Sequence, residues 1–327
     1  MKQPADSVIY YGMALDPIHV GTGGYRLGRV DNSIVREPGT NLPKLPGTSL
    51  SGACRAYTAM VADRYRWERD GLIYSCAGQG QANRKENKGG HCGQYSCPVC
   101  VSFGFAGERS GFQGLAQFSD ARILLFPVHS LAGPVWITCP AVLNDVKRLV
   151  NREYEINRGE DLQESLEDAV KLAPELKGVN NRINLGWLML PVNGSFQFSM
   201  DLPISKEIIK RTVLVPDKLF AQIVNDNLEV RTSVSISPET GAAEDGALFT
   251  YEAIPRSTIF WFTVTYLNPK LFSIAGQTPA PKVNNQDVEV KDIVQKGLQL
   301  FKDLGIGGMN TRGMGRLQIL WKEESHE

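Results

Sequence analysis

The sequence predicts an α+β fold with two insertions, and three observations support this prediction. Segments with strand-like alternation and segments with helical periodicity follow one another as strand, helix, strand, strand, helix, strand. A polar, glycine-rich stretch with four cysteines interrupts this order after the first helix. A second interruption, before the third strand, combines helical segments with a long hairpin pattern.

The first half of the core begins with an alternating run at Ser7 to Leu15, which predicts a strand. A glycine-rich loop follows from Asp16 to Arg29. Thr48 then starts a helix whose apolar face runs to Tyr65. A long strand is expected at Leu115 to Val128 and a shorter one at Val135 to Thr138.

The second insertion is expected to be helical and then β. Asn144 to Leu172 is charged and helical in pattern, and Ile204 to Val224 gives further helical stretches interrupted at Pro216. The runs Ser233 to Ser237 and Leu248 to Tyr251 flank a polar turn region, which is the signature of a long hairpin.

The core closes with a strong strand at Thr258 to Leu267, an amphipathic helix from Val290 and a final alternating strand at Leu317, Ile319 and Trp321. This order is the split βαβ arrangement of ferredoxin-like and RRM-like domains. We assign residues 1–72, 105–140 and 254–327 to a ferredoxin-like palm, 73–104 to a cysteine-rich insert, and 141–253 to a helical region with a hairpin thumb.

Composition describes an ordinary soluble core, with 42% hydrophobic and 21% charged residues among 327. Lys plus Arg and Asp plus Glu number 35 each, so bulk charge gives no support to nucleic-acid binding. Any RNA-binding surface must therefore be local. The polar N-terminus and the lack of an apolar run long enough to cross a bilayer favour a cytoplasmic protein with no membrane partner.

Four cysteines, Cys76, Cys92, Cys97 and Cys100, fall within one stretch that has few apolar side chains. The last two form a Cys-x-x-Cys turn, which presents two thiolates to one tetrahedral Zn²⁺. We expect a structural zinc site with His91 as an alternative ligand, since a metal supplies folding energy that burial cannot. Four protein ligands leave no open position for catalysis. Unpaired thiols or disulfides are the alternatives.

A loop with five glycines, two arginines and no acidic residue spans Gly305 to Arg316. It lies between a helix and a strand, whereas mononucleotide-binding loops lie between a strand and a helix, so a nucleotide cofactor is disfavoured. Bare backbone amides and arginines suit the phosphates of an RNA chain, although a plain turn is the alternative. The candidate contacts are Gly307, Gly308, Asn310, Thr311, Arg312, Gly313 and Arg316.

The start of the first helix is a second candidate phosphate site. Ser49, Ser51 and Arg55 lie off the apolar face of this helix. A helix N-terminus with free amides, hydroxyls and an arginine can bind an anion, while ordinary solvated capping residues are the alternative.

Several motifs together resemble the RAMP superfamily of CRISPR-associated proteins, and most closely the repeated backbone subunit of type III-B, or Cmr-type, effector complexes. They occur in the family's order from one end of the chain to the other. The motifs are His19 to Gly24, Val30 to Glu37, Leu45 to Gly52, Phe118 to Arg122, Leu125 to Val128, Gly246 to Phe249 and Ile306 to Leu317. The cysteine insert is not required by the resemblance.

The resemblance implies a subunit that polymerises head to tail along a guide RNA within a larger effector complex and presents the guide to a complementary target RNA. Sequence recognition then resides in base pairing, and the protein reads backbone and shape. The family's thumb hairpin corresponds to residues from Arg231 to Tyr251. By separating bases, a thumb lets a splayed target nucleotide align its 2′-hydroxyl with the neighbouring phosphodiester, so that the target is cut at regular intervals.

The family's catalytic aspartate corresponds to Asp31, whose implied role is to bind a divalent ion, Mg²⁺ or Mn²⁺, or to accept the 2′-hydroxyl proton. His19 is a neighbouring candidate, and Tyr251 and Glu252 lie near the family's other active-site positions. The glycine-rich turn adds Gly23 and Gly24 as RNA contacts.

Three other functions remain open from the sequence. The same fold can coat guide RNA without cutting, as a scaffold subunit. A guide-processing endoribonuclease of the same superfamily would act without a metal through a histidine. A zinc-dependent hydrolase using the cysteine cluster is disfavoured by the closed ligand shell.

Overall fold

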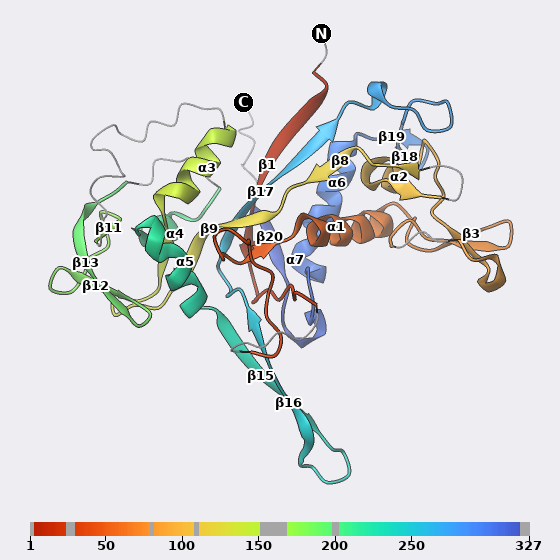
Figure 1. The fold of residues 1–327 in the computed structure, drawn as a ribbon. Coiled ribbons are helices and arrows are strands. Elements are labelled where there is room, and N and C mark those ends of the chain that lie inside the picture. The colour runs from red at the N-terminus through yellow and green to blue at the C-terminus, as the bar shows by residue number, and fades with distance from the viewer. Residues whose placement is uncertain are drawn as a thin grey trace. The chain divides into compact units, whose positions relative to one another are not determined.

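The computed structural model describes residues 3–23, 30–78, 82–107, 111–150, 169–197 and 203–320, which form a mixed α and β protein (Figure 1). The chain divides into two compact units. Unit 1 comprises Met1–Tyr10, Leu45–Ala121 and Phe262–Ile306, and unit 2 comprises Tyr11–Lys44, Arg122–Trp261 and Gly307–Glu327. Each predicted insert lies within one unit, residues 73–104 in unit 1 and 141–253 in unit 2, whereas β1 and β17 each run from one unit into the other.

A large sheet forms the centre of unit 2. Its strand order is β12-β13-β11-β14-β10-β9-β17-β1-β20. The bounds are β1 Ala5–Ala14, β9 Ala121–Val128, β10 Val135–Thr138, β11 Val170–Leu172, β12 Arg182–Leu185, β13 Leu188–Ser195, β14 Thr212–Leu214, β17 Ile259–Leu267 and β20 Leu317–Leu320. Consecutive apolar residues on β9 and β17 are buried, as in strands covered on both faces. Neighbouring β9, β17, β1 and β20 are the second, third, first and last strands of the predicted core.

Helices α3 (Pro140–Val150), α4 (Lys206–Ile209) and α5 (Asp217–Asp226) also belong to unit 2. The sequence placed helix over Asn144 to Leu172 and over Ile204 to Val224, and this was wrong at β11 and β14. Both strands are fully buried and only three residues long, which is too short for a strand period to be recognised in the sequence. Residues 151–168 of the expected helix lie outside the described part of the chain.

The long strand expected at Leu115 to Val128 is two strands, β8 (Ala116–Phe118) and β9. Ser119 and Asp120 separate them, and β8 pairs with the part of β17 that belongs to unit 1. This break turns the Asp120 side chain toward the backbone of the first helix, where it accepts a hydrogen bond from Gly47.

Unit 1 is built on α1 (Gly47–Val61), with α6 (Val290–Gln299) packed against it. The cysteine-rich insert follows α1 and lies against the same helix through α2 (Pro98–Phe103). The remaining short elements are β2 (Lys44–Leu45), β3 (Trp67–Arg69), β4 (Leu72–Tyr74), β5 (Lys88–Gly90), β6 (Phe105–Ala106), β7 (Gly111–Phe112), β18 (Lys282–Val283), β19 (Gln286–Asp287) and α7 (Phe301–Leu304).

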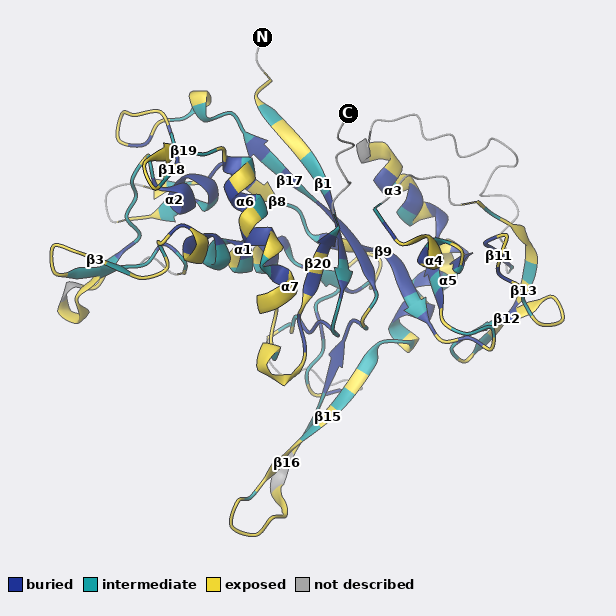
Figure 2. Cartoon of the chain, turned by 180° about the vertical axis from the view of Figure 1, so that it is seen from behind, coloured by how far each residue is buried: buried dark blue, intermediate teal, exposed yellow. Residues whose placement is uncertain are grey.

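The predicted hairpin forms in unit 2 from β15 (Glu229–Ile236) and β16 (Ala243–Ala253), which pair antiparallel. Exposure increases from its base toward its tip (Figure 2). Val234 and Leu248 are opposite each other and both exposed, while Ala253 at the base is fully buried. No helix within the described ranges has the length and apolar character needed to span a bilayer.

The contact between α1 and α6 tests the packing of unit 1. A Cβ at Gly297 of α6 would lie 2.9 Å from the Cys54 carbonyl oxygen and closer still to Thr58 Oγ1. We therefore expect Gly297→Ala to lower the free energy of unfolding by about 1–3 kcal/mol, because α6 must move away from α1. Chemical denaturation measures this change.

Gly52→Ala is the matched control, because Gly52 lies on the exposed side of α1 and a Cβ there meets nothing within 4 Å. Relief of glycine's conformational entropy should stabilise this variant by about 0.5–1 kcal/mol. Equal destabilisation by both substitutions would contradict the packing described for α6.

Candidate functional site

The base of β16 holds the loop that carries Asp31. Asn32 donates a backbone hydrogen bond to the Thr250 carbonyl (3.0 Å) and accepts one from the Glu252 amide (3.0 Å). Asn32 and Tyr251 therefore pair as a short parallel bridge. Strand β16 thus extends its pairing beyond the hairpin, and residues 31 and 250 become neighbours although 219 positions separate them.

The Asp31 carboxylate is exposed and is bonded through one oxygen. Its Oδ2 accepts hydrogen bonds from the Thr250 amide (2.7 Å) and the Thr250 hydroxyl (2.9 Å). The Thr250 amide, followed by the Thr250 hydroxyl, holds the pKa of Asp31 below its ordinary value, since both bonds favour the charged form. Asp31 therefore presents an ionised carboxylate at the surface at neutral pH.

His19 is buried beside the same strand. Its Nδ1 lies 2.6 Å from the Glu252 carbonyl oxygen, so Nδ1 carries the proton and donates it. The other ring nitrogen, Nε2, faces Gly21, where a Cβ would lie 3.0 Å away. The ring also contacts Tyr251 edge to face, with centroids 6.0 Å apart.

Glu252 forms a partly buried ion pair. Its Oε2 accepts a hydrogen bond from Arg36 Nη2 (2.9 Å) and lies 3.4 Å from the Ile34 amide. Arg36 Nε in turn donates to Asn225 Oδ1 of α5 (2.9 Å). The structure thus brings all four predicted catalytic residues together, but Glu252 and Tyr251 are buried and Asp31 alone among them is exposed.

The glycine loop near the C-terminus packs against the loop that carries Pro17 and His19. The Gly308 amide donates to the His19 carbonyl and the Gly315 amide to the Pro17 carbonyl, both at 2.9 Å. A Cβ at Gly307 would overlap the His19 carbonyl oxygen. Met314 is buried against Tyr251 of the hairpin base. Part of the glycine content therefore serves packing within the protein.

All seven loop residues predicted to bind RNA are exposed, namely Gly307, Gly308, Asn310, Thr311, Arg312, Gly313 and Arg316. Arg316 differs, because it forms two hydrogen bonds with the Asp16 carboxylate, Nε to Oδ2 at 2.5 Å and Nη2 to Oδ1 at 2.9 Å. This ion pair joins the two loops, and Asp16 partly neutralises the cation. Gly23 is exposed, and Gly24 lies outside the described residues.

The backbone amides at the start of α1 were expected to be free to bind a phosphate, but the first of them already has a partner within the protein. Asp120 Oδ1 accepts a hydrogen bond from the Gly47 amide (2.8 Å), so a carboxylate of the protein already occupies this helix end. The amides of Ser49 and Leu50 are bonded to the Pro46 carbonyl. A phosphate at this terminus would meet the Asp120 charge, and Ser49 and Ser51 are half-buried.

Arg55 was expected to face a phosphate, but its side chain contacts the cysteine insert. Its Nε donates to the Cys76 carbonyl (2.7 Å), Nη1 to the Phe103 carbonyl (3.3 Å), and Nη2 lies 2.9 Å from His91 Nε2. Burial lowers the pKa of this guanidinium from its ordinary value. Arg55 therefore ties α1 to the insert.

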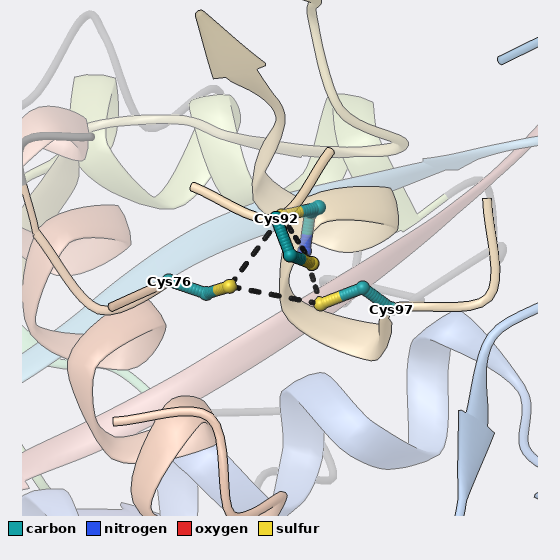
Figure 3. A group of neighbouring side chains, drawn as sticks. Cys76, Cys92 and Cys97 are labelled. Atoms are coloured by element: carbon teal, nitrogen blue, oxygen red, sulfur yellow. Dashed lines mark hydrogen bonds between the residues drawn. The ribbon is translucent and has the colours of Figure 1, made fainter. Parts of the chain in front are cut away.

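The four predicted cysteine ligands meet at one point, and these sulfurs lie within 4.8 Å of one another. Figure 3 shows Cys76, Cys92 and Cys97 with their sulfur atoms directed at one another. Sγ to Sγ distances are 3.7 Å for Cys92 and Cys100, 3.7 Å for Cys76 and Cys100, and 3.9 Å for Cys76 and Cys97. Sulfurs about 2.3 Å from a central ion, arranged tetrahedrally, are about 3.8 Å apart. The cluster could therefore hold a metal ion.

Local structure explains why the Cys-x-x-Cys pair converges. Cys97 precedes α2 and its sulfur accepts a hydrogen bond from the Cys100 amide (3.5 Å), so both thiols face the same side of the first turn. Hydrogen bonds from Cys100, and then from Cys92 and Cys97, hold the pKa of Cys76 far below its ordinary value. His91 bonds Arg55 and the Gly78 carbonyl and is not part of the cluster.

Sequence reasoning missed four residues that organise this site: Asp16, Arg36, Asp120 and Thr250. Arg36 and Asp120 fall within the recognised motifs and could have been noticed there. The roles of Asp16 and Thr250 depend on contacts across more than 200 positions, for which a single sequence carries no signal.

Comparison with known proteins gives a family match over most of the chain. Residues 13–318 match the RAMP superfamily. The chain is 29% identical over 322 residues to the CRISPR system Cmr endoribonuclease Cmr4 of Pyrococcus furiosus, covering 94% of this chain and 93% of that protein.

Solved structures share the fold. A Type III-B Cmr-beta complex bound to cognate target RNA contains a chain with a TM-score of 0.64 at 14% identity, and the match covers 97% of each chain. Oligomeric Cmr4 from Pyrococcus furiosus gives a TM-score of 0.56 at 19% identity, covering 96% of this chain and 98% of that one.

The pair of Asp16 and Arg316 makes stability depend on pH. Hydrogen bonding to Arg316 lowers the pKa of Asp16 below its ordinary value of 3.8. The pair should therefore stabilise the fold fully above pH 3.8, and this contribution should be lost as pH falls through the lowered pKa. We expect Asp16→Asn to have a lower Tm than the wild type at pH 7, with the difference vanishing in strong acid.

Arg316→Ala separates this pair from unrelated acid effects. It should lower Tm in the wild type but have little further effect in Asp16→Asn, since the partner is already absent. Additive losses in the double variant would show that the two side chains stabilise the protein independently.

Proposed function

The chain belongs to the RAMP superfamily, and from this premise we propose that it is a backbone subunit of a type III-B CRISPR ribonucleoprotein. It binds guide RNA and cleaves complementary target RNA at regular intervals, as an RNA-guided endoribonuclease. Further copies of itself, in a head-to-tail array, and other subunits of the effector complex are its protein partners.

Similarity to Cmr4, an endoribonuclease by name, along almost the whole chain supports the activity. The fold shared with a complex bound to target RNA and with oligomeric Cmr4 supports the RNA partner and self-association. The observation that carries the proposal is the exposed, ionised Asp31 beside the base of a long hairpin, with the Arg312 loop packed on the same base.

The proposed palm is ferredoxin-like, formed by β1, α1, β8 with β9, β17, α6 and β20. The hairpin of β15 and β16 is the proposed thumb, whose exposed Val234 and Leu248 separate target bases. A target nucleotide splayed by this wedge can direct its 2′-hydroxyl at the next phosphodiester. Attack leaves a cyclic phosphate and a 5′-hydroxyl.

Asp31 is the proposed catalytic residue. Both hydrogen bonds from Thr250 fall on Oδ2, and Oδ1 is the oxygen proposed to meet the 2′-hydroxyl or a divalent cation. One carboxylate oxygen together with RNA phosphates suits Mg²⁺ or Mn²⁺, which commonly bind through one or two carboxylates and substrate phosphates. Such a cation stabilises charge developing at the scissile phosphate.

The other candidate residues take supporting roles. His19 fixes the glycine loop through its carbonyl and orients Nε2 toward the surface turn at Gly21. Arg36 neutralises Glu252, so the buried carboxylate supports the site rather than the chemistry. Gly23, the exposed residues of the 307–313 loop and the hydroxyls of Ser49 and Ser51 are the proposed backbone contacts of RNA.

The cysteine cluster is the proposed site of a structural Zn²⁺. Four thiolates satisfy the preferred ligand number of zinc and leave no open position. The apolar cluster around these cysteines has few large side chains, with Val99 and Phe105 among them, so metal binding supplies much of the insert's folding energy.

Asp31→Ala tests the catalytic assignment in the assembled complex. We expect target RNA to bind with unchanged affinity while cleavage falls by at least about 100-fold, because the group that activates the 2′-hydroxyl is lost. End-group analysis of the wild-type products should give cyclic phosphate and 5′-hydroxyl ends. Unchanged cleavage by the variant would refute the assignment, and uncut target with the wild type would identify a scaffold subunit.

Arg312→Ala is the converse variant in the same experiment. It should weaken RNA binding for all sequences and reduce the slope of log affinity against log salt by about one phosphate contact. Arg69→Ala, an exposed arginine of β3 paired with Asp70, is the control and should leave this slope unchanged.

The zinc proposal predicts one equivalent of metal per chain in purified protein. Cys97→Ser should lose the metal and lower the Tm of the chain, since the insert has no comparable apolar core. Elemental analysis and thermal unfolding measure both effects. Cys139→Ser is the control. This cysteine is buried in unit 2, whereas the cluster lies in unit 1, so its substitution should leave the metal content intact. Full metal content in Cys97→Ser would remove Cys97 from the ligand set.

A further inference from the structure

We infer that Thr250 is the positioning residue for the Asp31 carboxylate. The inference rests on the proposed function, since it assigns to Thr250 the orientation of the group that acts on target RNA. Thr250 itself touches neither RNA nor cation in this scheme. It acts through the three hydrogen bonds that it forms with Asp31.

The contact is reciprocal. The Thr250 hydroxyl donates its one proton to Asp31 Oδ2 (2.9 Å) and accepts the Asp31 amide proton (3.1 Å). The Thr250 amide donates a second bond to the same carboxylate oxygen (2.7 Å). Because the hydroxyl meets both the backbone and the side chain of Asp31, it restricts rotation about the bonds that join them.

The two hydrogen bonds that Thr250 donates to the Asp31 carboxylate both fall on Oδ2. Because they fix the orientation of the carboxylate, they also fix the direction in which Oδ1 points. The amide of Asp31 itself also favours the charged carboxylate, and Thr250 is its partner from elsewhere in the described chain. The neighbouring positions are already fixed, since Val30 is buried and Asn32 is paired with β16 through both backbone groups. An exposed aspartate without such a partner would sample several rotamers. Thr250 therefore preorganises Oδ1 toward the solvent side of the site.

Thr250 also belongs to the hairpin. It is paired across the strands with Thr232, two cross-strand pairs nearer the base than Val234 and Leu248. The carboxylate and the proposed wedge are consequently attached to the same two strands. Their separation is set by the register of the hairpin, so that a base splayed by the wedge is presented at a fixed distance from Oδ1.

Thr250→Val and Thr250→Ser test this role in the assembled complex with guide RNA. Valine keeps the shape and the backbone amide but removes the hydroxyl. We expect its single-turnover cleavage rate to fall on the order of tenfold to 100-fold, with target affinity within about twofold of the wild type. Serine restores the hydroxyl and should recover the rate to within a few-fold.

Thr40→Val is the matched control. Its hydroxyl donates to a different carboxylate, that of the half-buried Glu37, at the same 2.9 Å, and its loss should leave cleavage unchanged. The thermal unfolding temperature of all three variants, measured alongside, reports the integrity of the fold. A rate loss in Thr250→Val that serine does not restore would show that the hydroxyl is not what matters and would overturn the inference.

A double-mutant cycle separates this inference from the proposed function. If Thr250 acts through Asp31, Thr250→Val should cause no further loss in the Asp31→Ala background. If Asp31→Ala cuts normally, both the proposed function and the role of Thr250 fail. If Asp31→Ala is inactive but Thr250→Val cuts like the wild type, only the positioning role fails.

Discussion

The pairing of residues 250–254 with two distant loops is the constraint on which the candidate site depends. The Glu252 amide donates to the Asn32 carbonyl, and the Glu252 carbonyl accepts a hydrogen bond from the His19 ring. Ile254 and Ile18 exchange two backbone hydrogen bonds. The glycine loop then bonds to the carbonyl of His19. Loss of this strand segment would separate Asp31, His19 and the glycine loop, which are all proposed to contribute to the site. The backbone therefore sets the site, and side chains refine it.

Electrostatics around this segment explains how a chain with no net charge can present a local binding surface. Glu252 is paired with Arg36 inside the site, and Asp16 is paired with Arg316 between the loops. These two ion pairs bring four nearby charges into contact with a charge of opposite sign. The Asp31 carboxylate and the Arg312 guanidinium remain exposed. Salt screens the interaction between exposed charges beyond about 10 Å, so the local arrangement of charges matters more for RNA binding than the net charge of the chain.

Patterns local in sequence predicted local structure well. The spacing of Cys97 and Cys100 predicted the turn that brings two thiols together, and alternation on either side of a polar turn predicted the hairpin. What failed depends on contacts between distant residues. The helical pattern predicted the start of α1 but not the hydrogen bond that Asp120 accepts there. Arg55 was expected to be available to RNA, but its guanidinium donates to backbone carbonyls of Cys76 and Phe103. Buried strands β11 and β14 are too short to show a period.

The glycine loop illustrates why composition alone could not assign its function. Gly307 is required by the protein itself, because its positive φ of 77° and the closeness of the His19 carbonyl exclude a side chain. Gly313 also has a positive φ, 75°, but a Cβ there would meet nothing within 4 Å. Internal packing therefore accounts for the first glycine, and conformation alone accounts for the second. On the outward side of the loop, where Gly313 adjoins Arg312, the space that a side chain would fill is open to the proposed phosphate contact.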